Sequence, residues 1–235
     1  MGEILEIIVT RLLVGLAVIA TLALPGCTSR KSDLTLVTAG KLAKSAIRPA
    51  KLKLDPVKLS NTARKALAST GPDEALATVQ FPSVKGQSVL RVIETNGPYS
   101  TWAAWGTSDR RTVTTKNGII TATRAIPPDL MSADVDGVLA LVSRREEGTV
   151  LYTQRYLDGN HQEIEAKTSC VVSRGYEQFV EYGQISQPAL QMFSSCVAKD
   201  RQFVDLYLVS GSGRILQSRQ WVGPKLGFAT FQLLR

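Results

Sequence analysis

The chain has 235 residues, of which 44% are hydrophobic and 20% are charged, so it can bury a core and is not disordered throughout. Its length allows one or two domains. The chain contains a single histidine, His161, which excludes zinc sites with two or three histidine ligands and histidine-paired catalytic relays. Any acid–base chemistry would therefore have to use carboxylates, lysine or tyrosine.

The first 26 residues have the pattern of a secretory signal. Arg11 precedes an almost wholly apolar run from Leu12 to Leu24. This run is too short to cross a bilayer as a helix, which takes about 20 residues, and it is typical of a signal peptide. The sequence Leu-Pro-Gly-Cys at 24–27 resembles a bacterial lipobox, although Pro25 departs from the usual pattern. The resemblance implies cleavage after residue 26 and a lipid on Cys27; the alternative is a buried helix with an incidental cysteine.

Residues 27–70 are predicted to form a basic tether. Between Arg30 and Lys65 there are ten basic residues and two acidic ones, whereas the rest of the chain is nearly balanced. Two stretches have weak helical periodicity, Leu34–Ile47 and Pro56–Ser69, and neither is expected to build a core. The basic charge would either attract anionic head groups or an acidic polymer, or simply keep a linker solvated.

From about residue 74 the spacing of apolar residues changes to the period of two that is typical of strands. The strands expected from this pattern are Leu76–Phe81, Ser88–Glu94, Thr101–Trp105, Arg111–Thr115, Ile119–Arg124, Val150–Leu157, Glu163–Ser173, Glu177–Ile185, Phe203–Val209, Ile215–Trp221 and Ala229–Leu234. Turn signals separate them, including Asn96-Gly97-Pro98, Asn117-Gly118 and Gly211-Ser212-Gly213. Only 128–141 has a helical or irregular pattern. The sequence thus predicts a mainly β domain over 71–235: an antiparallel meander of about eleven strands, closed into a barrel or folded into a sandwich.

Three cysteines are present. If Cys27 carries a lipid, Cys170 and Cys196 remain as an even pair in an oxidising compartment, which favours a disulfide. Two separate buried thiols are the alternative.

The sequence contains no nucleophile elbow, phosphate-binding loop or dinucleotide fingerprint. Glu163 and Glu165 would lie on one face of a strand, about 6.5–7 Å apart, which falls within the range of an inverting glycosidase pair. The same alternation is common on a solvent-exposed face. Asp134 and Asp136 lack the further ligands of a calcium loop, and no metal or other cofactor is expected. Nucleic acid is a poor candidate, since the β domain shows no basic–aromatic interleaving.

The C-terminal strand at 215–221 has mixed faces. Ile215, Gln217, Arg219 and Trp221 share one side, so polar residues lie between apolar ones. One explanation is structural: Arg219 pairs with a carboxylate inside the domain while Trp221 packs at the end of the barrel. The other is functional: Arg219 and Trp221 contact a secretion partner or a glycan, because arginine and tryptophan are favoured as interface anchors.

The run GRILQSRQWVGPKLG at 213–227, together with KNGIITATR at 116–124 and PDLMSAD at 128–134, resembles the YjbF/GfcB family of lipoproteins, which is linked to group 4 capsule and exopolysaccharide secretion. One departure is Ala125-Ile126-Pro127, where relatives have Gly-Leu-Gly, so a different local turn is expected. The resemblance implies a mainly β periplasmic domain tethered to the outer membrane, with a cysteine pair at 170 and 196. It also implies that this domain acts together with an outer-membrane β-barrel partner. It carries over no catalytic residues.

The leading hypothesis is therefore a non-enzymatic, outer-membrane-anchored periplasmic lipoprotein that assists exopolysaccharide or capsule secretion. The alternatives are a polysaccharide-modifying enzyme that uses Glu163 and Glu165, and a purely structural envelope lipoprotein.

Overall fold

The computed structural model describes residues 54–158, 160, 162–198 and 201–235. The predictions for Cys27 and for a helix over 34–47 lie outside the described residues, as does His161. Twelve strands and two α-helices make up most of the described chain. Their bounds are α3 Pro56–Ser69, β1 Leu76–Phe81, β2 Gly86–Asn96, β3 Tyr99–Ala104, β4 Thr112–Lys116, β5 Ile119–Arg124, β6 Leu130–Asp134, α4 Asp136–Arg144, β7 Gly148–Leu157, β8 Glu163–Tyr182, β9 Ile185–Val197, β10 Gln202–Ser210, β11 Ile215–Gly223 and β12 Gly227–Leu233, with a short 3-10 helix at Pro82–Val84.

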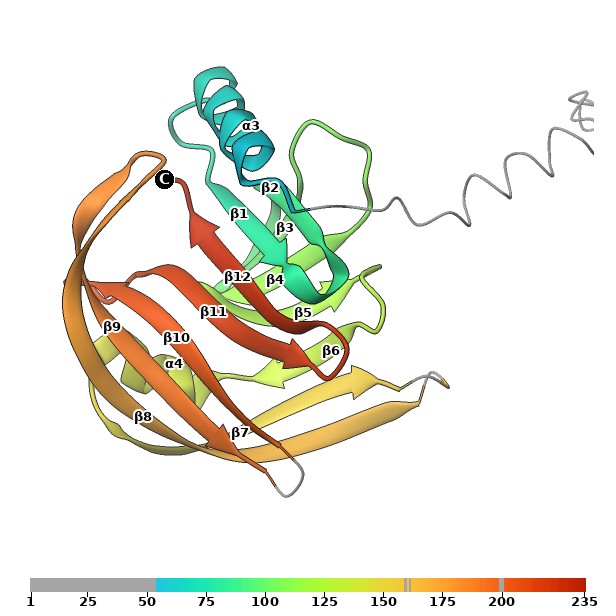
Figure 1. Cartoon of the computed structure of the whole chain (residues 1–235), viewed down its shortest axis with the longest axis vertical. Coiled ribbons are helices and arrows are strands. Elements are labelled where there is room, and N and C mark those ends of the chain that lie inside the picture. The colour runs from blue at the N-terminus through green and yellow to red at the C-terminus, as the bar shows by residue number, and fades with distance from the viewer. Residues whose placement is uncertain (1–53, 159, 161, 199–200) are drawn as a thin grey trace, which may run out of the picture. The chain divides into compact units, whose positions relative to one another are not determined.

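The strands form one antiparallel sheet in the order β5-β4-β3-β2-β1-β12-β11-β10-β9-β8-β7-β6 (Figure 1). Each strand pairs with its neighbours in sequence except at two places. β1 pairs with β12, and β5 and β6, which are consecutive in the chain, occupy the two ends of the order. The sheet thereby curls into a nearly closed barrel. The predicted antiparallel meander is confirmed, and of the two predicted closures the barrel is the one formed.

Side chains bridge the gap between β5 and β6. The carboxylate of Asp129 accepts hydrogen bonds from the Thr123 hydroxyl and from the backbone N–H groups of Ala125 and Ile126. The guanidinium of Arg124 donates to the carbonyl of Leu130 on β6. Ala125 itself adopts the left-handed conformation, with φ of 59°, that a glycine favours. The alanine therefore takes up a glycine-like backbone angle at this corner.

Three strands differ from the sequence expectation. Glu163–Ser173 and the start of Glu177–Ile185 are one long strand, β8, interrupted only by a bulge between Arg174 and Glu177. The strand that follows, β9, was missed, because its buried residues Ala189, Leu190, Gln191 and Met192 run consecutively and break the alternation. Residues 130–134, expected to be helical or irregular, form β6, because they find a pairing partner in β7; the helix starts only at Asp136.

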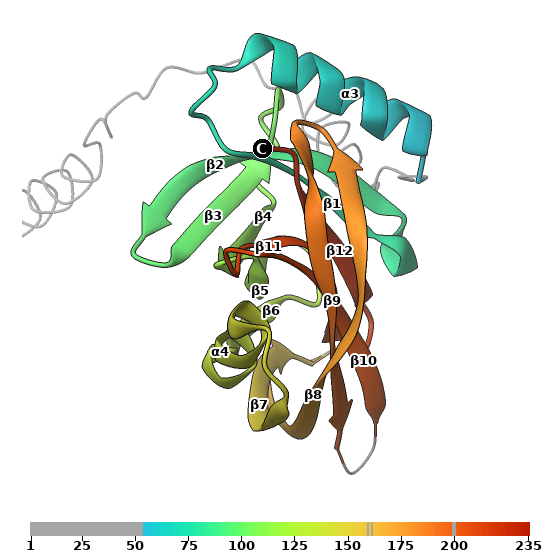
Figure 2. The same cartoon turned by 90° about the vertical axis from the view of Figure 1, so that its left-hand side faces the viewer.

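The helix α3 has the predicted bounds and begins with an N-cap, in which the Asp55 side chain accepts a hydrogen bond from the N–H of Lys58. The expectation that it would not build a core is wrong. Leu59, Ala63 and Ala66 are buried against Leu76 and Leu234, and α3 lies across β1 and β2 (Figure 2). Although the helix falls within the predicted tether, it packs on the β domain.

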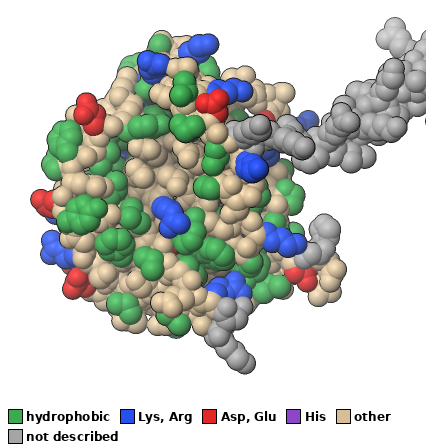
Figure 3. Space-filling model, viewed as in Figure 1, with side chains coloured by type: hydrophobic (Ala, Val, Ile, Leu, Met, Phe, Trp, Pro, Cys, Tyr) green, Lys and Arg blue, Asp and Glu red, His purple; other side chains and the backbone are tan. Residues whose placement is uncertain are grey.

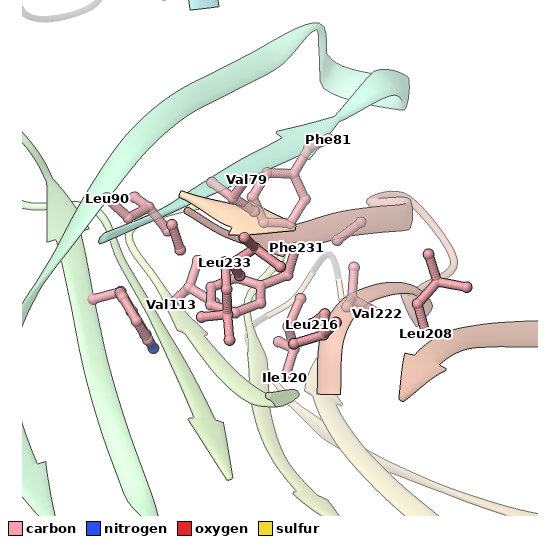
Figure 4. Packing of buried hydrophobic residues seen from close by; sticks show 14 of the residues in the cluster. Val79, Phe81, Leu90, Val113, Ile120, Leu208, Leu216, Val222, Phe231 and Leu233 are labelled. Atoms are coloured by element: carbon pink, nitrogen blue, oxygen red, sulfur yellow. The ribbon is translucent and has the colours of Figure 1, made fainter. Parts of the chain in front are cut away.

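Two larger clusters fill the barrel. One draws residues from most strands of the barrel, among them Val79, Leu216 and Phe231 (Figure 4). The Phe231 ring contacts the Trp102 ring edge-on. The other lies between α4 and the inner side of β7–β10 and includes Val138, Val142, Met192 and Tyr207. Cys170 on β8 and Cys196 on β9 face each other in register within this second cluster and are joined by a disulfide. The predicted disulfide is present in the structure.

Candidate functional site

The sequence predicts which side chains of β11 share a side of the strand, and the structure shows which of these sides is buried. Leu216, Ser218, Gln220 and Val222 are buried, whereas Arg219 is exposed and Trp221 is half-buried. Ser218 and Gln220 are held from inside the barrel: Gln220 accepts a hydrogen bond from the N–H of Ile120 and donates to the hydroxyl of Ser218. The polar residues on the buried side of β11 are therefore structural.

The other side of β11 carries an aromatic cluster. The Trp221 ring stacks on Phe203 with centroids 5.8 Å apart and meets Phe228 edge-on at 5.5 Å. The guanidinium carbon of Arg219 lies 3.6 Å from the centroid of the Phe228 ring, a cation–π contact. The expected carboxylate partner is replaced by an aromatic ring: within the described residues Arg219 forms no ion pair. Trp221 packs as the structural explanation predicts, whereas Arg219 presents its charge to solvent.

The side of β7–β10 opposite to the buried Phe203 is an exposed apolar face, which adjoins Arg219 on β11. Leu151 on β7, Val171 on β8, Val197 on β9 and Val204 on β10 are 79%, 52%, 53% and 39% exposed. The strand register places them diagonally from one strand to the next, and Leu206, two residues after Val204, pairs with Arg219. In Figure 3, hydrophobic side chains are spread among polar and backbone atoms over the visible surface of the molecule. We define the exposed apolar face as the surface formed by Leu151, Val171, Val197, Val204, Leu206, Arg219, Trp221 and Phe228.

Buried side chains hold the backbone of Trp221 from the inner side. Asp205 accepts a hydrogen bond from its N–H at 2.7 Å, and the Gln154 amide donates to its carbonyl at 2.9 Å. Desolvation raises the pKa of the Asp205 carboxyl to about 7, although hydrogen bonds from Trp221 and Tyr207 and the charge of Arg219 oppose the shift. The adjacent Tyr152 and Tyr207 hydroxyls are also fully buried, and burial raises their pKa well above the ordinary range. A buried polar layer thus fixes the position of Trp221.

A second feature is a cleft of about 670 Å³ at the barrel mouth. It lies where three hairpin turns meet: β2–β3, β4–β5 and β10–β11. Asn117 and Gly118 both have positive φ, as the predicted type I′ turn requires. A side chain at Gly118 would press on Ile215, and one at Gly213 would collide with the carbonyl of Ser143 in α4. Small residues therefore allow these turns to approach one another.

The two glutamates of the enzymatic alternative lie on the exposed outer face of β8. Arg155 forms ion pairs with both, and Lys167 pairs with Glu165. Hydrogen bonds from Lys167 and Arg155 lower the pKa of Glu165. A general acid in a glycosidase needs a raised pKa instead, so this pair is not arranged for glycoside hydrolysis.

Among the described residues, no group of three or more His, Cys, Asp and Glu side chains is placed to hold a metal ion. Nor does this part of the chain contain a helix with the length and hydropathy needed to span a membrane.

These features define a class of protein: an antiparallel, barrel-like β domain with an exposed apolar face and a polar-rimmed cleft. The sequence model of the family described as group 4 capsule polysaccharide lipoprotein gfcB, YjbF, matches residues 57–234. The chain therefore belongs to this family and is a capsule-related lipoprotein of the cell envelope. The resemblance of the sequence to this family is confirmed.

Two solved structures are similar to this chain to different degrees. The hypothetical lipoprotein YmcC from Escherichia coli K12 is 14% identical with a TM-score of 0.61, and the match covers 87% of this chain and 97% of that one. At this identity the likeness shows a shared fold. An exported protein with a YmcC-like fold from Bacteroides fragilis is 8% identical with a TM-score of 0.29, covering 71% of this chain and 96% of that one. No curated protein matches the chain.

Proposed function

We propose that this chain is a non-catalytic lipoprotein, anchored in the outer membrane through acylated Cys27, that assists secretion of a capsule or exopolysaccharide. In this proposal the β domain lies on the periplasmic side and docks through its exposed apolar face onto an outer-membrane β-barrel exporter. Family membership supports the connection to capsule. The observation that carries the docking role is the exposed apolar face itself.

The composition of this face favours a protein partner. Trp221 and Phe228 are large aromatic side chains held in place by packing, and Arg219 lies between them and Leu206. Aromatic residues and arginine contribute most to the affinity of protein interfaces, and contiguous exposed apolar side chains commonly mark such interfaces. The face spans neighbouring strands and offers area rather than a pocket, which suits another protein surface.

We expect the triple variant Leu151→Ser, Val171→Ser, Arg219→Ala to lose most polysaccharide export while remaining folded. All three side chains are exposed, so their replacement removes apolar contact area and the arginine anchor without opening the core. Export is measured as cell-surface polysaccharide in a strain that carries only the variant, with its amount in the membrane fraction checked against wild type. Val57→Ser, which alters a residue on α3 that is 70% exposed, is the matched control and should export normally. Normal export by the triple variant at wild-type level would refute docking through this face.

The anchor is tested separately, at a residue outside the described part of the chain. Cys27→Ser should abolish incorporation of radiolabelled fatty acid and move the protein from the membrane fraction to the soluble fraction, or leave it uncleaved, because the thiol is the site of acylation. Wild-type protein that carries no lipid would contradict the anchor. The presence of Thr28 in place of Asp after the cysteine leads us to expect fractionation with the outer membrane.

A further inference from the structure

A small apolar pocket lies where the β11–β12 turn approaches the β7–β8 hairpin. Its volume is about 190 Å³, and its apolar walls are formed by Pro128, Tyr156, Leu157, Ile164, Gly223 and Pro224. The pocket is open to solvent, because Ile164 is 41% exposed and Pro224 is exposed as well. No side chain fills the space at Gly223, since a Cβ atom there would have no neighbour within 4 Å.

One wall of the pocket is an aromatic side chain that is fixed in place. Tyr156 is 4% exposed, and its hydroxyl accepts a hydrogen bond of 2.5 Å from the guanidinium of Arg201. The same guanidinium lies over the Tyr156 ring, 5.7 Å from its centroid. A partner that enters the pocket therefore does not have to order this wall, and the entropic cost of binding is reduced accordingly.

The rim of the pocket carries a cation without a partner. Within the described part of the chain, the ammonium of Lys225 forms no hydrogen bond, ion pair or ring contact. Asp158 also lines the pocket, but its carboxylate accepts hydrogen bonds from the backbone N–H groups of Asn160 and Gln162 in the β7–β8 loop. The rim thus offers a free positive charge beside apolar walls.

Size and lining together favour a single aromatic ring as the occupant. Clefts for small ligands usually have at least about 300 Å³, whereas an apolar cavity of about 150 Å³ takes benzene. A sugar is disfavoured, because its hydroxyls would lose their hydrogen bonds to water against apolar walls. The rings of Pro128 and Pro224 offer flat apolar surfaces, and proline-rich segments are recognised by aromatic side chains in the same manner.

We propose that this pocket receives an aromatic side chain of the protein partner, and that a carboxylate beside that ring pairs with Lys225. The inference rests on the proposed function, which brings a partner to this end of the barrel. Gly223 follows Trp221 by two residues along β11. Gln154, whose amide donates to the Trp221 carbonyl, precedes Tyr156 by two residues on β7. A partner that covers Trp221 therefore lies next to the pocket, where a buried aromatic anchor would contribute strongly to affinity.

The test uses the full-length protein in lipid nanodiscs, with the δ1-methyl groups of isoleucine labelled with ¹³C. Three small probes are titrated: phenylacetate has a ring and a carboxylate, phenethylamine a ring and a cation, and octanoate an aliphatic chain and a carboxylate. We expect phenylacetate to shift the methyl signal of Ile164 and to leave that of Ile93, which is 49% exposed on β2, in place. Phenethylamine should bind about fivefold more weakly, because its cation meets Lys225.

Lys225→Glu should reverse this order, so that phenethylamine binds more tightly than phenylacetate. The matched control is Lys65→Glu, which alters an exposed cation on α3 outside the pocket and should keep the wild-type order. The inference is overturned if neither aromatic probe shifts Ile164, if octanoate binds more tightly than phenylacetate, or if Lys225→Glu leaves the order unchanged.

Polysaccharide export separates this pocket from the exposed apolar face. Ile164→Asp, Lys225→Glu should export less polysaccharide than wild type at an equal amount of protein, because two negative charges then surround the pocket, whereas Lys65→Glu should export normally. Normal export by this double variant refutes the pocket, and the Leu151-containing triple variant still decides docking through the exposed apolar face. If the triple variant exports normally and the pocket variant does not, docking through that face fails and the pocket stands.

Discussion

Replacing Asp205 by asparagine is expected to stabilise the domain above pH 7 and to remove most of a pH dependence that the wild type shows between about pH 4 and 8. Burial raises the pKa of the Asp205 carboxyl from its ordinary 3.8 to about 7 in the folded protein. Between these values the folded state keeps a proton that the unfolded chain releases. The stability contributed by Asp205 is therefore complete below about pH 4 and is lost as the pH rises through 7, by up to about 4 kcal/mol.

Asparagine keeps the shape of the site without the charge. Its carbonyl can still accept the hydrogen bond from the Trp221 N–H, and its amide can donate to the Tyr207 oxygen. The measurement is urea unfolding of wild type and Asp205→Asn at pH 5, 6, 7 and 8, with the disulfide intact. Asp134→Asn, at an exposed carboxyl at the end of β6, is the control and should leave the wild-type pH profile unchanged. An Asp205→Asn protein less stable than wild type at pH 8 would show that the ionised carboxylate stabilises the fold.

The second large effect is expected from removal of the disulfide. Cys170 and Cys196 are fully buried and are separated by 26 residues. In the entropic model, opening a loop of this size costs about 3.5 kcal/mol, because the unfolded chain regains conformational freedom. For a domain of this size, we expect Cys170→Ala, Cys196→Ala to lower Tm by roughly 10 °C. Scanning calorimetry of both proteins at one pH measures the difference.

Two neighbouring residues on the same strands provide the control. Val171 and Val197 follow the cysteines directly in sequence, but their side chains are exposed on the opposite face of the sheet. Val171→Ala, Val197→Ala should therefore change Tm by no more than a small fraction of the effect of the cysteine double variant. Equal Tm values for wild type and the cysteine double variant would mean that the long β8–β9 ladder alone restrains this loop.

Asp205 and the disulfide both lie beneath the exposed apolar face and support it. Asp205 and Gln154 hold the backbone of Trp221, and the disulfide joins β8 to β9, which carry Val171 and Val197 of the exposed apolar face. If Asp205 sets the position of Trp221, its protonation also affects the geometry of the proposed docking face. Polysaccharide export is measured in a strain that carries Asp205→Asn and is compared with the stability of the variant protein. A change in export without a loss of stability indicates an effect on the docking face rather than on folding.

Sequence reasoning was sufficient wherever the determining interactions are local. Pro56–Ser69 forms a helix with the predicted bounds because its cap and its apolar spacing lie within the segment. The Asn117-Gly118 turn follows from the positive φ that these two residues tolerate. Alternation along β11 predicted which residues share a side of the strand, but only the barrel decided which side is buried, and Ile215, expected on the side of Arg219, is buried too. Two strands were missed for different reasons. Pairing with β7 makes β6 a strand despite its local pattern, and burial on both faces removes the alternation from β9.

Only the tertiary structure decided how distant residues meet. The turns at Asn96-Gly97-Pro98, Asn117-Gly118 and Gly211-Ser212-Gly213 are each visible in the sequence, but their convergence on one cleft depends on barrel closure. The partner of Arg219 is an aromatic ring on β12 rather than a carboxylate, since β11 and β12 pair in a register that no local pattern reveals. In the sequence, nothing distinguishes Asp205 from an ordinary polar residue of a strand. It is buried with a raised pKa because α4 and the neighbouring strands enclose its side of the sheet, and desolvation depends on everything packed around a group.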